Sequence, residues 1–107
     1  MEFRRIDVHA VRAMLEAAPD TQIVDIRDEQ SFQQGHIDSA LHLDNSSVQS
    51  FIDGADLDRP LVVYCYHGNM SQSAAAYFSE QGFAETYSMD GGFSDWELHC
   101  QDRVKRG

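Results

Sequence analysis

The part of the sequence best suited to chemistry is the segment around Cys65. An apolar run from Leu61 to Tyr64 ends at this cysteine, and a short loop containing Gly68 separates it from an alanine-rich segment that begins near Ser71. If the loop curls around the sulfur, its backbone N–H groups form an anion-binding nest, and the positive end of the next helix reinforces it. Both effects lower the pKa of a cysteine below its usual value of about 8.5. The segment therefore predicts a thiolate nucleophile.

The loop itself supplies the candidate substrate-binding residues. Gly68 permits backbone angles that side chains disfavour, and Asn69 tolerates them. A protonated His67 would add positive charge beside the sulfur. The full candidate set is Tyr66, His67, Gly68, Asn69, Met70 and Ser71. A buried, inert cysteine is the alternative, because free cysteines often lie in the interior. The glycine in the loop and the helix start favour the nucleophile.

The elements that must position this loop alternate between short strands and helices. Apolar runs predict strands over 22–26, 41–43, 61–65 and 85–88. Amphipathic spacing predicts helices over 7–17, 28–34, 46–52, 71–81 and 94–101, with N-caps at Asp7 and Asp28. This alternation favours an α/β fold with a mostly parallel sheet and helices on both faces. The 61–65 strand is apolar without alternation, as a central strand is, and ligands bind at the carboxyl ends of such strands.

Length and charge restrict the classes of partner. The chain has 107 residues, which fits a single domain over residues 1–107. Eighteen acidic residues against eight basic ones give a net charge of −10, which argues against nucleic acid and anionic lipid as partners. The same charge repels any anionic substrate, so local donors must overcome it. No apolar run reaches the roughly 18 residues of a membrane span, and no apolar stretch follows the charges at the start. We therefore expect a cytoplasmic protein.

Four segments of the chain resemble the rhodanese family, and they occur in the order that the family shows. They are Ile23–Arg27, with its Asp-x-Arg end; Phe32–Ala40, with Gly-His-Ile; Cys65–Asn69, the cysteine loop; and Asp90–Trp96, with Gly-Gly and a tryptophan. Together they extend the match over nearly the whole chain. The resemblance is nearest to the small single-domain bacterial thiosulfate sulfurtransferases associated with glycerol-metabolism genes.

The resemblance implies a rhodanese-like α/β fold with a five-stranded, mainly parallel sheet. It implies that the Cys65 thiolate takes the outer sulfur of thiosulfate, releases sulfite and holds a persulfide. Cyanide, a small thiol or a thioredoxin-like protein would then remove the sulfur. Neither a metal nor an organic cofactor is implied. From their positions, Asp25, Arg27 and Gly91 are interpreted as structural support: Asp25 and Arg27 as a polar pair at a strand end rather than a catalytic acid and a charge clamp, and Gly91 as part of a tight turn before the last helix. One covalent intermediate shared by two half-reactions predicts ping-pong kinetics.

Two other functions remain open on the sequence alone. The chain could be a catalytically idle rhodanese-like binding module, although such modules usually lose the cysteine. It could also be a cysteine phosphatase or arsenate reductase. The related phosphatases place an arginine six positions after the cysteine, but here Ser71 occupies that position, and no arginine or lysine lies between Arg59 and Arg103. A phosphate dianion would lack its bidentate guanidinium partner, which favours sulfur transfer.

The loop also departs from the family pattern. Many rhodaneses carry a cation within the loop, whereas this chain has Tyr66, Asn69 and Met70 there. Binding of the thiosulfate anion would then rest on backbone amides alone. This predicts a high KM for thiosulfate and leaves the physiological sulfur donor open.

Overall fold

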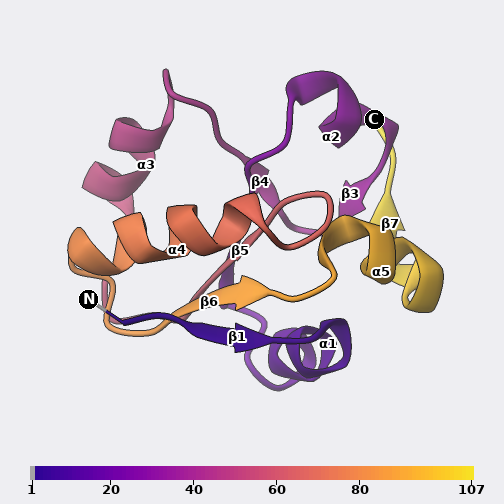
Figure 1. The fold of residues 1–107 in the computed structure, drawn as a ribbon, viewed down its shortest axis with the longest axis horizontal. Helices are drawn as coiled ribbons and strands as arrows, with labels where there is room; N and C mark the ends of the chain where they lie inside the picture. Colours follow the sequence, from indigo (N-terminus) through magenta and orange to yellow (C-terminus); the bar gives the residue numbers. More distant parts are fainter. Residues whose placement is uncertain (1) are drawn as a thin grey trace.

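In the computed structural model, which describes residues 2–107, a five-stranded parallel sheet forms the centre of the fold (Figure 1). Its strands are β1 (Arg4–Ile6), β2 (Gln22–Asp25), β4 (Leu41–His42), β5 (Leu61–Tyr64) and β6 (Thr86–Met89). They lie in the order β1-β6-β5-β2-β4, and each pairing within this sheet is parallel. The predictions of a parallel sheet and of a central 61–65 strand are confirmed. Residue 1 of the predicted domain lies outside the described residues.

Helices cover both faces of the sheet (Figure 1). The helices are α1 (Val8–Ala17), α2 (Glu29–Gln34), α3 (Val48–Gly54), α4 (Met70–Glu80) and α5 (Gly92–His99). A single 3-10 turn, Gln101–Arg103, follows α5. Beyond it, β7 (Val104–Lys105) pairs antiparallel with β3 (His36–Ile37), so the end of the described chain lies beside α2. No helix within residues 2–107 has both the length and the apolar character that a membrane span requires.

The central strand β5 is held by two separate apolar layers. Val62 and Tyr64 belong to the layer of α1 and α5, which also contains the fully buried Trp96. Leu61 and Val63 belong to the layer of α4, which also contains Phe78. Each of the four β5 side chains is completely buried. Because successive strand residues point to opposite faces, an unbroken apolar run is what a strand with two covered faces requires.

Local capping signals in the sequence predicted the starts of two helices. The carboxylate of Asp7 accepts a hydrogen bond from the amide of Ala10 at 2.9 Å, which confirms it as the N-cap of α1. The carboxylate of Asp28 likewise accepts from the amide of Ser31 at 3.1 Å and caps α2. Such caps satisfy amides that have no partner within the helix.

Two predicted helix starts differ from the observed ones by two residues, and that of α4 differs by one, at Met70 rather than 71. Helix α3 begins at Val48 rather than at 46, because the carboxylate of Asp44 binds the amides of Ser46 and Ser47 and holds them in a preceding turn. Helix α5 begins at Gly92 rather than at 94, since Gly91 at φ 79° provides the turn into it. Strand β1 was not among the strands that the apolar pattern predicted, because its only apolar residue is Ile6 and its ladder partner β6 is remote in sequence.

Truncating a β5 side chain should cost much more stability than truncating an exposed one. We expect Leu61→Ala to lower the free energy of unfolding by about 2–5 kcal/mol, since it removes buried apolar area and leaves a cavity. Leu98→Ala is the matched control, because Leu98 is 71% exposed, and it should stay within about 0.5 kcal/mol of the parent. Urea denaturation measures both. Equal losses in the two variants would contradict the central position of β5.

Candidate active site

The sulfur of Cys65 lies in a nest of hydrogen-bond donors at the carboxyl end of β5. Its Sγ accepts from the amide of Gly68 at 3.2 Å and from the amide of Ser71 at 3.3 Å. The hydroxyl Oγ of Ser71 is 3.5 Å from the same sulfur. The residue is 5% exposed. The structure thus brings three of the predicted site residues together around one atom.

The direction of the loop amides is set by helix α5. The amide of Phe93 donates to the carbonyl of Cys65 at 2.9 Å, and the amide of Ser94 donates to the carbonyl of Tyr66 at 3.0 Å. These two donors are free at the N-terminus of α5, where amides have no partner within the helix. Since they hold the first two loop carbonyls outward, the following peptide N–H groups are left to turn toward the sulfur.

A third loop carbonyl is held from helix α4. The side-chain amide of Gln72 donates to the carbonyl of Gly68 at 3.0 Å. Gly68 adopts φ 94°, and a Cβ there would lie 2.9 Å from the backbone nitrogen of Gly91. Glycine is therefore required at position 68 both for the backbone angle and for the close approach. Asn69, which would tolerate such angles, has φ −89° and does not adopt them.

The donors around the sulfur favour the thiolate. Burial raises the pKa of the Cys65 thiol, but hydrogen bonds from the Ser71 hydroxyl and from the amides of Ser71, Gly68 and His67 lower it, and the net pKa lies below the ordinary value. Ser71 is fully buried, and its Oγ lies 2.8 Å from Oγ of Ser88 on β6. That contact holds the Ser71 hydroxyl near the sulfur. Ser88 was absent from the predicted site, although the sequence places it at the end of a predicted strand.

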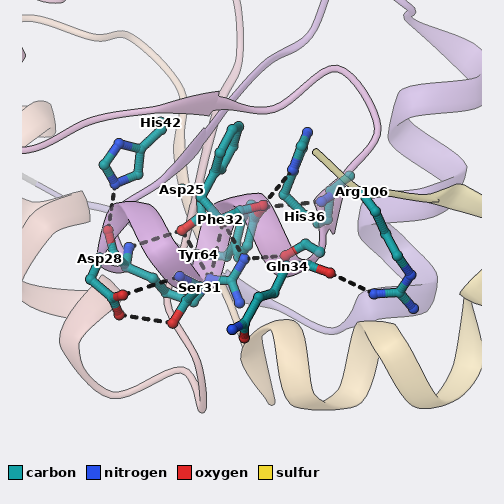
Figure 2. Close-up of polar contacts among 12 residues, drawn as sticks. Asp25, Asp28, Ser31, Phe32, Gln34, His36, His42, Tyr64 and Arg106 are labelled. Atoms are coloured by element: carbon teal, nitrogen blue, oxygen red, sulfur yellow. Dashed lines mark hydrogen bonds and ion pairs between the residues drawn. The ribbon is translucent and has the colours of Figure 1, made fainter.

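A buried ion pair lies beneath the loop. Nη2 of Arg27 donates to Oδ2 of Asp25 at 2.6 Å, and the amide of Arg27 donates to Oδ1 at 2.8 Å. Nη2 also donates to the carbonyl of Gly35 at 2.6 Å. The side chain of Arg27 is 5% exposed and that of Asp25 is 0% exposed. Because both charges are buried, each needs the other as its partner. Figure 2 shows this network together with Tyr64, whose hydroxyl accepts from the amide of Ile37 at 3.1 Å.

The guanidinium of Arg27 also contacts the loop through aromatic rings. Its carbon Cζ lies 4.2 Å from the ring centre of Phe93 and 5.7 Å from that of Tyr66. Cations on aromatic faces are stabilised electrostatically. The structure places Asp25 and Arg27 in a buried ion pair whose guanidinium lies near the loop residue Tyr66, and their supporting role stays a prediction. Arg27 additionally links α5 to the residue that follows Cys65.

The Gly-Gly segment before α5 supports the loop mainly through its second glycine. Gly91 was the predicted supporting residue, and at φ 79° a Cβ there would overlap the carboxylate of Asp95. Gly92 has φ 61°, and a Cβ would lie 2.5 Å from the carbonyl of Tyr66 and 2.6 Å from that of Cys65. Gly92 was not predicted as a site residue. The feature of the sequence that could have indicated its role is the adjacent pair Gly91-Gly92.

The remaining loop side chains form an exposed rim. Met70 is 72% exposed and Tyr66 is 47% exposed, and His67 and Asn69 are exposed as well. The amide of His67 contributes to the nest. Within residues 2–107, no group of three or more His, Cys, Asp or Glu side chains is arranged to hold a metal ion. The arrangement is suited to stabilising a negatively charged sulfur beside an open rim.

Comparisons with known proteins agree with this geometry. The family model described as the rhodanese-like domain matches residues 7–99. The Thiosulfate sulfurtransferase GlpE of Pseudomonas aeruginosa is 60% identical over 94 residues, which are 88% of this chain and 84% of that protein. The protein of the same name from Pseudomonas savastanoi pv. phaseolicola is 51% identical over 106 residues, which are 99% of this chain and 98% of that protein.

Solved structures of more distant proteins share the fold. A rhodanese-like domain protein from Staphylococcus aureus aligns with a TM-score of 0.81 at 17% identity, covering 98% of this chain and 99% of that one. The rhodanese-like domain of the Anabaena protein Alr3790 aligns with a TM-score of 0.84 at 22% identity, covering 100% of this chain and 81% of that one. The predicted fold class is thereby confirmed.

Removing the Ser71 hydroxyl should weaken the thiolate. We expect Ser71→Ala to move the pH midpoint of Cys65 alkylation by iodoacetamide to higher pH, because a donor that lowers the pKa is lost. Alkylation at neutral pH should slow several-fold. Ser73→Ala on the exposed face of the same helix is the control and should leave the midpoint in place. An unchanged midpoint in Ser71→Ala would show that this hydroxyl does not act on the thiol.

A methyl group at position 92 should disturb the loop. We expect Gly92→Ala to destabilise the protein by about 1–3 kcal/mol, because the added Cβ meets the backbone of Cys65 and Tyr66. Gly54→Ala is the matched control, since no atom lies within 4 Å of a Cβ built there. It should be neutral or stabilising by about 0.4–1 kcal/mol. Thermal unfolding compares the pair, and similar behaviour would refute the close approach.

Proposed function

Since this chain belongs to the rhodanese-like domain family, we propose that it is a thiosulfate sulfurtransferase that carries the transferred sulfur on Cys65. The observation that supports this role is that the backbone amides of Gly68 and Ser71 both donate hydrogen bonds to Sγ of Cys65. Relatives that match at 51–60% identity over most of their length carry the name thiosulfate sulfurtransferase.

In the first half-reaction, the Cys65 thiolate attacks the outer sulfur of thiosulfate. A bond forms between Sγ and that sulfur, the sulfur–sulfur bond of thiosulfate breaks, and sulfite leaves with the electron pair. The product is an anionic persulfide on Cys65. The amides that stabilise the thiolate are also positioned to stabilise this anion, since fixed donors need no reorganisation during the reaction.

In the second half-reaction, an acceptor removes the sulfur and regenerates the thiolate. Cyanide, a small thiol or a thioredoxin-like protein would serve, and the exposed rim formed by Tyr66 and Met70 leaves the loop open to any of them. The two half-reactions share the enzyme-bound persulfide, so the kinetics should be ping-pong.

The geometry gives little support to phosphate chemistry. Ser71 occupies the position at which a phosphatase loop carries arginine, and its side chain is buried against Ser88. The guanidinium of Arg27 lies beneath the loop and is committed to Asp25. A phosphate at Cys65 would therefore have no bidentate cation inside the loop.

We place this activity in the cytoplasm. The mechanism requires a reduced cysteine, and both Cys65 and Cys100 are free thiols. A reducing compartment keeps such thiols available.

Incubation with thiosulfate tests the first half-reaction directly. We expect intact-mass measurement to show the gain of one sulfur atom by the parent protein and no gain by Cys65→Ser, because the nucleophile is then absent. Cys100→Ala is the matched control: this cysteine is 1% exposed and should not carry sulfur, so the adduct should persist. An adduct that survives in Cys65→Ser, or none in the parent protein, would refute the proposal.

A further inference from the structure

A cavity beside the cysteine loop is lined by residues of α2 and α5 and by Tyr66 of the loop. Its volume is about 200 Å³, the size of a small organic molecule. Its charged and aromatic walls are formed by Arg27, Tyr66, Phe93, Glu97 and Arg106. One of its lining residues, Tyr66, directly follows Cys65 in the sequence.

One guanidinium nitrogen of Arg27 remains available to this cavity. Nε and Nη2 donate to Asp25, and Nη2 donates also to the carbonyl of Gly35. Within residues 2–107, Nη1 of Arg27 donates no hydrogen bond, although the Arg27 side chain is only 5% exposed. Nη1 is not among the buried polar atoms that lack a partner, so it is accessible from the cavity that Arg27 lines. The cavity thus contains an accessible cationic donor suited to an anion.

Arg106 brings a second guanidinium to the same cavity. Its Nη1 donates at 2.6 Å to the carbonyl of Gln34, the last residue of α2 (Figure 2). The pairing of β7 with β3, together with a hydrogen bond from the amide of Gly107 to the carbonyl of Gln33 at 2.7 Å, fixes this segment. Gly35 leaves the space for it, because a Cβ there would lie 2.8 Å from Nη1 of Arg106.

The cavity also contains a negative group. Glu97 of α5 lines it, and within the described part of the chain neither Glu97 nor Arg106 takes part in an ion pair closer than 4.0 Å. Arg27 is already paired with Asp25, whereas Arg106 and Glu97 line the same volume without an ion pair between them. This distribution complements a ligand that has a carboxylate and an ammonium group close together.

We propose that this cavity binds the α-amino-acid head of a small thiol that accepts sulfur from Cys65. Arg27 and Arg106 bind the carboxylate of the thiol, and Glu97 binds its ammonium group. The thiol extends past Tyr66 toward the sulfur. The assignment rests on the proposed sulfurtransferase function and supplies the acceptor class that the function leaves open.

The transfer balances without another reactant. The bound thiol, as its thiolate, attacks the outer sulfur of the Cys65 persulfide. A sulfur–sulfur bond forms with the acceptor, the bond from that sulfur to Sγ breaks, and Cys65 keeps the electron pair as a thiolate. The acceptor leaves as a persulfide and carries any proton that was on the outer sulfur.

Four small thiols allow the contributions of the carboxylate and the ammonium group to be measured separately. Cysteine carries both, mercaptopropionate only the carboxylate, cysteamine only the ammonium, and mercaptoethanol neither. In Arg106→Gln we expect kcat/KM for cysteine and mercaptopropionate to fall about five- to tenfold, as the loss of a charge-assisted contact predicts. Cysteamine and mercaptoethanol should change less than about twofold. Each thiol is compared with itself across the variants, so its intrinsic nucleophilicity cancels.

Two further variants complete the kinetic test. Glu97→Gln should lower kcat/KM for cysteine and cysteamine but not for mercaptopropionate. Lys105→Gln removes the same charge as Arg106→Gln one residue away, outside the cavity lining, and should leave all four thiols unchanged. The proposal is overturned if Arg106→Gln affects the four thiols equally or not at all, if Lys105→Gln matches it, or if Glu97→Gln does not discriminate. A loss confined to persulfide formation from thiosulfate would assign the cavity to the donor and would also overturn it.

A binding measurement separates this site from the proposed function. Serine, an unreactive analogue of cysteine, is titrated into the Cys65→Ser protein, and amide shifts are followed by NMR. We expect saturable shifts at Gly35 and Tyr66 that disappear when Arg106→Gln is added. If the parent forms no persulfide while these shifts remain, the sulfurtransferase function fails and the site stands. If persulfide forms but no shifts occur, the site fails and the function stands.

Discussion

The orientation of three peptide carbonyls controls the chemistry of this protein. The carbonyls of Cys65, Tyr66 and Gly68 accept hydrogen bonds from donors outside the loop, and the intervening amides are thereby left to converge on Sγ. Backbone donors fixed in this way stabilise a negative sulfur in its thiolate and persulfide forms alike. The donors come from the start of α5 and from α4, so the geometry of one atom depends on the packing of two helices on opposite faces of the sheet. The orientation of the loop amides toward Sγ therefore depends on these contacts from outside the loop.

The buried Asp25–Arg27 pair serves this arrangement rather than overall stability. A buried ion pair gains little net free energy because both groups lose their hydration. Here the pair ties the end of β2 to the carbonyl of Gly35, and the guanidinium lies against Phe93, the first residue of α5 to bind the loop. The same side chain thus contacts three segments that are distant in sequence. The same residue also lines the cavity of the proposed acceptor site, together with Arg106 and Glu97.

Local signals allowed much of this structure to be predicted, and long-range contacts account for what was missed. The unbroken apolar run before Cys65, the caps at Asp7 and Asp28, and the glycine in the loop act through neighbouring residues, so the sequence reveals them directly. Strand β1 and the β3–β7 pair could not be seen, because each depends on a partner far along the chain and carries few apolar residues. Ser88 and Gln72 were missed for a related reason: a hydroxyl and an amide have many uses, and only the fold shows which atom they face. The expectation that thiosulfate is bound by loop amides alone stays a prediction, whereas the position of Arg106 beside α2 depends on the long-range β3–β7 pairing and could not be predicted.

The placement of β5 between two apolar layers has a consequence for motion. Leu61 and Val63 are held by one layer, and Val62 and Tyr64 by the other, so the strand cannot detach from one face while keeping the other intact. Exchange of its amide hydrogens with solvent then requires the separation of both layers at once, which is the opening of highest free energy that a domain undergoes. The nucleophile therefore follows a strand whose opening requires both layers to separate, while the loop side chains around it at Tyr66, His67, Asn69 and Met70 are exposed.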